Sequence, residues 1–243
     1  MKQYDAYVFD LYGTLVDIHT DEHIAAPWKA LADYAASCGA HYRLPELRER
    51  YLRLCAAQEE KLRGSSACPE IDLQPVFAAL LSEKGVFPEE AMVREAAWRF
   101  RQASTSHLRL YAGAKELLEA LRRSGSYVLL LSNAQALFTR PELRLLGIDR
   151  AFDRVYISSD RGCRKPAPAF FQTPLNALDL DPARCLMIGN DPDCDVRGAA
   201  AVGMDSVYLH SGLSPAYDPG APATWTQRGM DLNKLMRRLL EKR

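Results

Sequence analysis

The sequence predicts an α/β protein built on a parallel sheet, because buried-strand patterns alternate with helical patterns along much of the chain. Short apolar runs that lack polar–apolar alternation suit strands covered on both faces. Such runs occur at Ala6–Phe9, Tyr127–Leu131, Arg154–Ile157, Cys185–Ile188 and Ser206–Leu209. Helical patterns lie among them at Gly113–Arg123, Pro168–Leu178 and Asp195–Val202. In open parallel sheets a ligand binds at the carboxyl ends of the strands, so the polar residues that follow these runs are the first candidates for a site.

The predicted helices carry their own end signals. In Gly113–Arg123, three leucines fall on one face and Gly125 follows as a stop. Gly203 ends the stretch that begins at Asp195. The segment SGLSPAYDPGAPATWTQRGM is rich in Pro, Gly and Ser, so we expect a loop there, followed by a last helix at Leu232–Lys242 with a basic outer face.

The stretch from Ile18 to His107 breaks the alternation, because it carries only helical patterns. They are Trp28–Ser37, Leu44–Glu60, Leu73–Lys84 and Glu89–Ser104. About ninety residues are far too many for one crossover between strands. We therefore expect a catalytic core made of residues 1–17 and 108–243, with residues 18–107 inserted after the first strand as a helical subdomain over the strand ends.

Composition excludes several classes of function. The 243 residues hold 31 basic and 31 acidic side chains, so no net field favours nucleic acid or an anionic membrane. No apolar run approaches the ~20 residues that span a bilayer, and the start MKQYDAYVFD lacks the apolar core of a signal peptide. The six cysteines form no CxxC pair, which indicates reduced thiols in the cytoplasm rather than a disulfide frame or a zinc site.

Polar residues follow four of the apolar runs, in order along the chain. The stretch YVFDLYGTLVD places Asp10 directly after the first run, with Thr14 nearby. LLLSNA ends the second run in Ser132 and Asn133, and SSDRGCRKPAP carries Lys165 after the third. MIGNDPDCDVRGA follows the fourth with four more polar residues, Asn190, Asp191, Asp193 and Asp195. Each set alone is ordinary turn or cap chemistry, but the four together, with a helical insert after the first, predict one site.

These four stretches resemble the motifs of the haloacid dehalogenase-like (HAD) hydrolase superfamily, and the resemblance covers essentially the whole chain. It implies a Rossmann-like core with a helical cap inserted between the first and second motifs. It also implies that Asp10 is a nucleophile that forms a covalent aspartyl ester, which water then cleaves. By the same resemblance Ser132 and Asn133 bind an anionic substrate group, and Lys165 keeps the nucleophile ionised. Thr14 is expected to order the loop or the nucleophile through its hydroxyl group.

The fourth motif implies a magnesium site, with two registers left open. Counting back from DVRGA puts Asn190 at the first acid position and Asp195 at the last, whereas counting on from Gly189 pairs Asp191 with Asp195. Mg²⁺ prefers oxygen ligands, so Asp10, the main-chain carbonyl of Tyr12, and Asn190, Asp191 or Asp195 are the expected ligands. Asp193 is expected to be exposed or to cap the helix that follows.

Tyr12 stands where phosphatases of this superfamily have a second aspartate that protonates the leaving alcohol. Tyrosine, with a pKa of ~10, is a poor general base at neutral pH, although its hydroxyl can still bind a ligand. A tyrosine here is also a feature of the 2-haloacid dehalogenases, in which halide leaves without a proton. Three features argue against that function. The dehalogenases have a tyrosine six residues after the lysine of the third motif, where this chain has Phe171. They also use an arginine from the cap, with which none of Arg43, Arg48 and Arg50 can be aligned, and their fourth motif is poorer in acids than this one.

The sequence therefore predicts a HAD-like hydrolase that acts, with Mg²⁺, on a small phosphorylated metabolite. The alternatives are a metal-independent 2-haloacid dehalogenase and a catalytically weak member that binds a ligand. The expected partner is a small anionic molecule and neither nucleic acid nor a membrane. The sequence specifies neither the substrate nor the oligomeric state, and His19, His23, Trp28 and Arg43 are candidates to line the cap side of the site.

Overall fold

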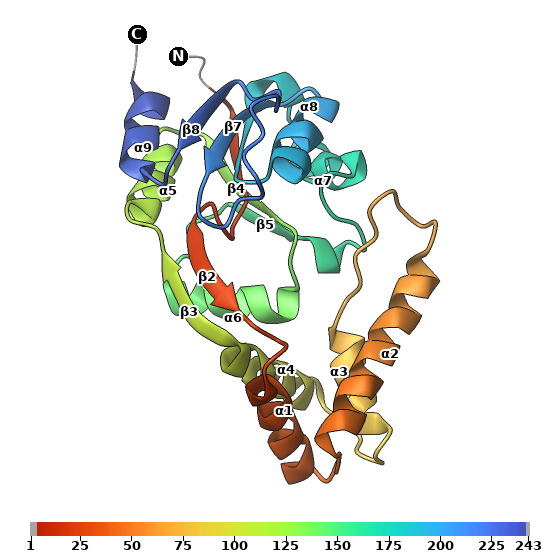
Figure 1. The fold of residues 1–243 in the computed structure, drawn as a ribbon. Helices are drawn as coiled ribbons and strands as arrows, with labels where there is room; N and C mark the ends of the chain where they lie inside the picture. The colour runs from red at the N-terminus through yellow and green to blue at the C-terminus, as the bar shows by residue number, and fades with distance from the viewer. Residues whose placement is uncertain (1–3, 242–243) are drawn as a thin grey trace.

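The computed structural model describes residues 4–241, and its centre is a six-stranded parallel sheet (Figure 1). The strands lie in the order β5-β4-β1-β6-β7-β8. Their bounds are β1 Ala6–Phe9, β4 Tyr127–Ser132, β5 Arg154–Ile157, β6 Cys185–Gly189, β7 Asp205–His210 and β8 Trp225–Arg228. The predicted α/β class and parallel sheet are confirmed, and β1 lies between β4 and β6 in the middle of the sheet.

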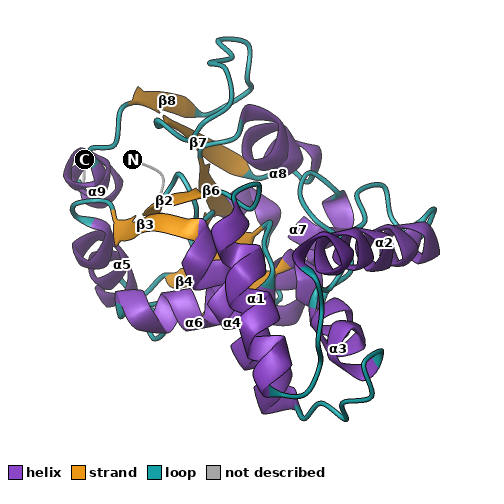
Figure 2. Ribbon diagram, turned by 60° about the horizontal axis from the view of Figure 1, so that its bottom comes forward, coloured by secondary structure: helices purple, strands orange, loops and turns teal. Residues whose placement is uncertain are grey.

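Both faces of the sheet are covered by helices, which explains why its strands read as continuous apolar runs. On one face, Phe9 and Leu130 join a buried cluster with leucines of α5, Ala114–Arg123, and α9, Leu232–Leu240. On the other face, Val8 packs with residues of α7, Pro168–Leu178, and the short α8, Gly198–Ala201. Figure 2 shows these two helix pairs on opposite sides of the strands. The six strands are thereby held rigidly, with their carboxyl ends at one edge.

The helical insert forms a second layer with its own core. It consists of α1 Ala25–Ser37, α2 Leu44–Leu62, α3 Gln74–Ser82 and α4 Glu90–Ser104. Trp28, Tyr51, Phe77 and Phe100 meet at its centre, with the rings of Trp28 and Phe100 4.9 Å apart between centroids. Such edge-to-face pairs and their burial stabilise the layer, and Leu137 and Phe138, which follow β4, pack into the same cluster. We call α1–α4 the helical layer.

Two antiparallel strands that the sequence pattern did not predict join the helical layer to the sheet. They are β2, Val16–Thr20, and β3, Thr105–Leu110, and they pair with each other rather than with the large sheet. β2 crosses the predicted start of the insert at residue 18, and β3 crosses its predicted end at residue 107. The helices between them begin at Ala25 and end at Ser104. In Figure 1 this two-stranded stalk runs between the sheet above and the helices below. The division into a core and an inserted domain stays a prediction.

Other elements differ from the sequence pattern. A helix, α6 Ala136–Leu146, follows β4 although Pro141 interrupts its pattern, and β8 lies inside the expected loop. The stretch from Asp195 is not a regular α-helix, because Pro192–Arg197 forms a π-helical turn that leads into α8. The last helix ends at Leu240, and the predicted end at Lys242, like residues 1–3 and 243 of the predicted core, lies outside the described residues.

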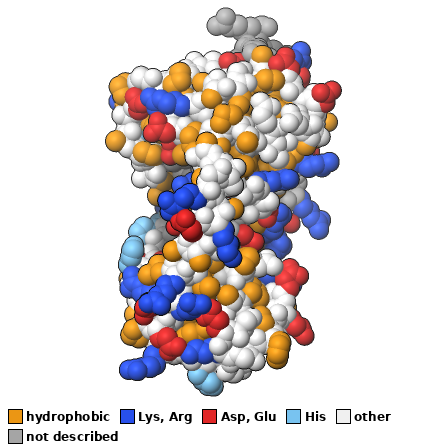
Figure 3. All heavy atoms as spheres, turned by 90° about the vertical axis from the view of Figure 1, so that its right-hand side faces the viewer, with side chains coloured by type: hydrophobic (Ala, Val, Ile, Leu, Met, Phe, Trp, Pro, Cys, Tyr) orange, Lys and Arg blue, Asp and Glu red, His pale blue; other side chains and the backbone are white. Residues whose placement is uncertain are grey.

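The surface carries both signs of charge, as the composition predicts. Figure 3 shows Lys and Arg side chains interspersed with Asp and Glu on the face it displays, above and below a narrowing of the molecule. Within residues 4–241 no helix is both long and apolar enough to cross a membrane. The six cysteines are free thiols.

Candidate active site

The four predicted motifs converge at the carboxyl edge of the sheet, around a pocket of about 230 Å³. Asp10 follows β1, Asn133 follows β4, and Asn190 and Asp191 follow β6, so neighbouring strands deliver them to one place. Lys165 comes from the loop before α7. The complete lining is Asp10, Tyr12, Asn133, Lys165, Asn190, Asp191, Cys194, Asp195, Leu213 and Pro215. Segments that lie far apart along the chain thus form one polar cavity.

Lys165 links two carboxylates at the bottom of this pocket. Its ammonium donates to Asp10 Oδ1 at 2.8 Å and to Asp195 Oδ1 at 2.6 Å. All three side chains are nearly buried, with Lys165 only 2% exposed, so the pairing offsets the cost of removing their charges from water. The arrangement holds Asp10 in a fixed orientation with one oxygen engaged by a cation.

The electrostatics follow from burial and from this pairing. Burial alone lowers the pKa of Lys165, but the charges of Asp10 and Asp195 outweigh it, so its pKa lies above the ordinary value and the amine stays protonated. Burial raises the pKa of the Asp195 carboxyl, and the contact with Lys165 only partly opposes that shift. The site therefore contains a permanent cation beside the residue predicted to be the nucleophile.

The second oxygen of Asp10 faces a cluster of oxygen atoms and one amide. Thr14 Oγ1 donates to Asp10 Oδ2 at 3.2 Å. With its nitrogen turned toward the loop, the Asn190 amide lies 3.1 Å from Tyr12 O, 3.2 Å from Asp10 Oδ2 and 3.3 Å from Thr14 Oγ1. Gly13, with φ of 82°, makes room for it, because a Cβ there would lie 2.3 Å from the Asn190 side chain. A half-turn of the amide replaces its nitrogen by an oxygen at the same place.

The three aspartates of the fourth motif make different contacts. Asp195 has both oxygens engaged, one by Lys165 and the other by the main-chain N–H of Asp191 at 2.9 Å. Gly189 permits this approach, since a Cβ there would lie 2.2 Å from Asp195 Oδ2. Asp191 caps the π-helical turn by accepting from the N–H groups of Asp193 and Cys194, both at 2.8 Å, and also lines the pocket. Asp193 itself is exposed.

This distribution bears on the predicted metal site. No three His, Cys, Asp or Glu side chains among residues 4–241 are grouped to hold a metal ion. The groups that could bind a metal ion here are instead Asp10 Oδ2, the main-chain carbonyl of Tyr12 and the side chains of Thr14 and Asn190. All can offer oxygen, which is the chemistry that Mg²⁺ accepts, with water completing its shell. Asp191 also lines the pocket, so the residues present fit Mg²⁺.

The residues of the second motif are engaged differently from each other. Asn133 exchanges two hydrogen bonds with the main chain of Lys165, its Oδ1 accepting at 2.8 Å and its Nδ2 donating at 2.9 Å. Ser132 is fully buried at the end of β4, and within the described chain its hydroxyl has no hydrogen-bond partner. A buried hydroxyl without a partner is uncommon and is available to a ligand that reaches it.

Tyr12 lines the pocket, but its hydroxyl is already occupied. It donates to Glu142 Oε2 and lies 3.0 Å from Thr139 Oγ1, both on α6. Burial, and then the Glu142 charge, raise the pKa of Tyr12 far above its ordinary value, so it is neutral at all physiological pH. Two residues after Asp10 the structure thus holds a neutral, hydrogen-bonded hydroxyl and not a carboxylic acid.

The residues proposed to line the cap side do not line this pocket. Trp28 is buried within the helical layer, and its indole N–H donates to Glu22 O at 2.7 Å. His19 stacks against His107 on the stalk, and Arg43 stands at the start of α2. Two features of the site were not predicted. Leu213 and Pro215 lie in the expected loop, whose composition does not indicate that it reaches the pocket, and Glu142 lies on a helix that was missed.

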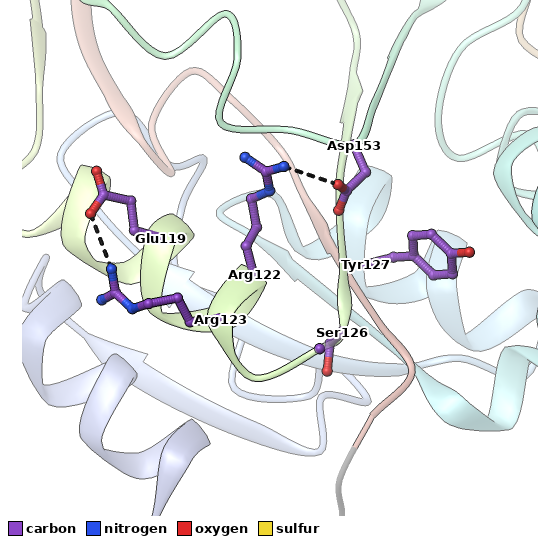
Figure 4. Close-up of a pocket in the computed structure, with 7 residues that line it drawn as sticks. Glu119, Arg122, Arg123, Ser126, Tyr127 and Asp153 are labelled. Carbon is purple, nitrogen blue, oxygen red and sulfur yellow. Dashed lines mark hydrogen bonds and ion pairs between the residues drawn. The ribbon is translucent and has the colours of Figure 1, made fainter.

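A second pocket, of about 570 Å³, lies at the opposite edge of the sheet, at the start of β4 (Figure 4). Its charges pair with one another, Arg122 with Asp153 at 3.5 Å and Arg123 with Glu119 at 3.4 Å. Its buried serine, Ser126, donates to Tyr4 O at 2.8 Å, and its charged side chains are paired with one another near the surface. The pocket at the carboxyl edge, with its buried Asp10, Lys165 and Asp195, is therefore the candidate active site.

Known proteins resemble this chain in sequence. A sequence model of the haloacid dehalogenase-like hydrolases matches residues 4–203. A phosphoserine phosphatase of Thermus thermophilus is 36% identical over 147 residues, which cover 60% of this chain and 57% of the relative. A glyceraldehyde 3-phosphate phosphatase of Methanopyrus kandleri is 28% identical over 167 residues, covering 67% of this chain and 72% of the relative. The chain thus spans little more than half of the Thermus protein.

Solved structures share the whole fold at low identity. A HAD phosphatase from Thermococcus onnurineus has a TM-score of 0.60 at 23% identity, covering 99% of this chain and 98% of the other. A dehalogenase solved with an intermediate complex has a TM-score of 0.59 at 22% identity, and all of both chains is covered. A phosphatase and a dehalogenase therefore share this fold, so the fold alone does not distinguish between the two activities. The family match over residues 4–203 decides the identity: this chain belongs to the haloacid dehalogenase-like hydrolases.

Proposed function

We propose that the protein hydrolyses a small phosphate monoester through a covalent intermediate on Asp10. The observation that carries the proposal is the way in which the Asp10 carboxylate is held at the pocket. Its Oδ1 accepts from the Lys165 ammonium at 2.8 Å, and its Oδ2 accepts from Thr14 Oγ1 at 3.2 Å. A carboxylate held in one orientation at a pocket lined mainly by polar residues is a suitable nucleophile. The names of the relatives, phosphatases of small metabolites, support phosphate as the group transferred.

The proposed reaction has two steps. An oxygen of Asp10 attacks phosphorus, the bond from phosphorus to the leaving alcohol oxygen breaks, and the alkoxide that leaves takes a proton from water. A water molecule then attacks the phosphorus of the aspartyl phosphate, the bond from phosphorus to the Asp10 oxygen breaks, and inorganic phosphate and the free Asp10 carboxylate are released. Lys165 and Ser132 are proposed to offset the phosphoryl charge, and Asn133 holds the loop of Lys165. Thr14 keeps Asp10 oriented.

A bound Mg²⁺ would neutralise charge on the phosphoryl oxygens. We propose Asp10, the Tyr12 carbonyl and the Asn190 amide oxygen as its protein ligands, with Asp191 reaching it directly or through water. Asp195, named with them from the sequence, has both oxygens engaged by Lys165 and the Asp191 N–H, so we assign it to holding Lys165 instead.

The helical layer is proposed to act as the cap, close to the predicted 18–107 insert. Its α2–α3 loop reaches the core beside the site, where Glu70 accepts from Ser158 at 3.0 Å and Arg164 N donates to Cys68 O at 2.9 Å. Arg164 directly precedes Lys165, so a substrate is enclosed between this loop and the strand ends. Enclosure of this kind excludes water and lets the cap select the substrate.

The test is a panel of phosphorylated metabolites and p-nitrophenyl phosphate, assayed with and without Mg²⁺. The proposal predicts turnover that Asp10→Asn abolishes and that is faster for good leaving groups, because Tyr12 cannot serve as the acid. Chloride release from 2-chloropropionate that persists in chelator would replace it with the metal-independent dehalogenase, the function that Tyr12 favours. Thermal stabilisation by a phosphorylated ligand without any turnover would instead favour a binding role.

A further inference from the structure

A buried charge network that the reaction above does not use surrounds Tyr12. Glu142 is 1% exposed and accepts from the Tyr12 hydroxyl through Oε2 and from Arg101 Nε through Oε1, the latter at 2.6 Å. Thr139 lies fully buried beside it. A carboxylate in such a place is stable only because both of its oxygens are engaged by donors.

The three residues of this network come from three different parts of the molecule. Tyr12 lies on the loop that carries Asp10, Glu142 lies on α6 of the core, and Arg101 lies on α4, the last helix of the helical layer. The Arg101 guanidinium also lies over the rings of Phe138 and Tyr12, at 5.2 and 5.9 Å from their centroids. Three residues beyond Arg101, α4 ends and the stalk begins at Thr105. The network therefore stands where the helical layer joins the core.

The main chain of Tyr12 faces the opposite way, toward the pocket. Its carbonyl lies 3.1 Å from the Asn190 amide beside Asp10, while its side chain is fixed by Glu142. The loop is also held by main-chain bonds, including Gly13 N to Val16 O at 2.8 Å and Leu15 N to Leu11 O at 2.8 Å. The side chain of Tyr12 thus links α6, and through Glu142 also α4, to the loop that holds the nucleophile.

We propose that Glu142 is a positioning residue, which joins the Tyr12 hydroxyl to Arg101 and so couples the position of the helical layer to the nucleophile loop. The Tyr12 hydroxyl donates its hydrogen bond to Glu142 and therefore does not act on the substrate. This assignment goes beyond the hydrolysis itself, and only its kinetic test rests on the proposed function.

The experiment compares Glu142→Gln and Tyr12→Phe with the wild type. The matched control is Glu83→Gln, which changes the Arg50–Glu83 ion pair on the outer part of the helical layer. Steady-state kinetics with p-nitrophenyl phosphate separate kcat from KM, and hydrogen exchange is followed for the amides of Leu11–Val16. We expect both network variants to lower kcat about tenfold to hundredfold with KM nearly unchanged, because small misplacements of a reacting group have effects of that size. Their double variant should be hardly worse than either single one.

Exchange in Leu11–Val16 should accelerate in both network variants and stay at the wild-type rate in Glu83→Gln. A loss of kcat in Tyr12→Phe with unchanged exchange would mean that the hydroxyl acts on the substrate, and would overturn the proposal. Lower thermal stability with kcat and exchange unchanged would reduce the network to a structural contact, and would also overturn it. If the wild type hydrolyses no phosphate ester, only the proposed function is wrong. The hydrogen-exchange rates of Leu11–Val16 then still test the role of Glu142.

Discussion

Asn133 and Lys165 exchange two hydrogen bonds, so that the side chain of one fixes the main chain of the other. Asn133 Oδ1 accepts from Lys165 N at 2.8 Å, and Asn133 Nδ2 donates to Lys165 O at 2.9 Å. The lysine side chain continues from this clamp to Asp10 and Asp195. The position of the active-site cation is thus set by an asparagine that follows a different strand.

Asn133→Ala should weaken both stability and catalysis. Two hydrogen bonds worth about 1 kcal/mol each are lost, so we expect unfolding to become about 2 kcal/mol easier, with kcat reduced because Lys165 is less well placed. Urea unfolding and kcat with p-nitrophenyl phosphate measure the two effects. Asn176→Ala, an exposed asparagine on α7, is the control and should change neither. Wild-type kcat in Asn133→Ala would refute the clamp.

Ser132→Ala should leave the protein at least as stable as the wild type while weakening anion binding. The Ser132 hydroxyl is buried without a partner among residues 4–241, so its removal breaks no hydrogen bond. Ser126→Ala gives the contrast, because Ser126 Oγ donates to Tyr4 O at 2.8 Å and that variant should be less stable. Thermal melts and titration with inorganic phosphate test this, with affinity expected to fall about tenfold in Ser132→Ala alone. Destabilisation of Ser132→Ala to the extent of Ser126→Ala would contradict it.

Asn190→Asp should raise the affinity for Mg²⁺ and destabilise the metal-free protein. A carboxylate replaces a group that can donate to the oxygens of Tyr12, Asp10 and Thr14, and it adds a negative charge beside Asp10. We expect the dissociation constant for Mg²⁺, measured by calorimetry, to fall about tenfold or more. Asp193→Asn, which changes an exposed carboxylate of the same motif, should leave it unchanged. An unchanged constant in Asn190→Asp would exclude this position as a ligand.

Stability should fall as the pH rises above about 10. The pKa values of Tyr12 and Lys165 are raised in the folded state, so above their ordinary values, about 10 and 10.4, the unfolded chain loses protons that the folded chain retains. Each such proton lowers the unfolding free energy by about 1.4 kcal/mol per pH unit. Tyr12→Phe removes one of them, so its loss of stability with pH, followed by urea unfolding from pH 8 to 11, should be shallower.

Much of the sheet and site was predictable because buried parallel strands have a distinct composition and deliver their polar ends to one edge. The run Arg154–Ile157 and the helix Pro168–Leu178 have the predicted bounds. The stalk strands were not predicted, since no residue of β3 is buried and it carries no apolar run. Helix α6 was missed because Pro141 interrupts its pattern, and Glu142 with it.

The finer geometry of the site depends on contacts that no spacing reveals. Nothing local to Asn133 indicates that its amide binds the main chain of Lys165, 32 positions further along the chain. Likewise the partner of Tyr12 lies 130 positions away on α6, so the sequence identified the unusual residue but not what its hydroxyl contacts. Tertiary packing alone decides both.

The central claim, that Asp10 is the nucleophile, is tested most directly by trapping the intermediate. Enzyme mixed with a slowly hydrolysed phosphate ester is quenched in acid and treated with borohydride, which reduces an acyl phosphate to the alcohol. Peptide mass spectrometry then locates the modified residue. We predict homoserine at position 10 in the wild type after mixing with substrate, and none without substrate or in Asp10→Asn. An enzyme that turns over the ester while Asp10 stays unmodified under the same quench would contradict the account.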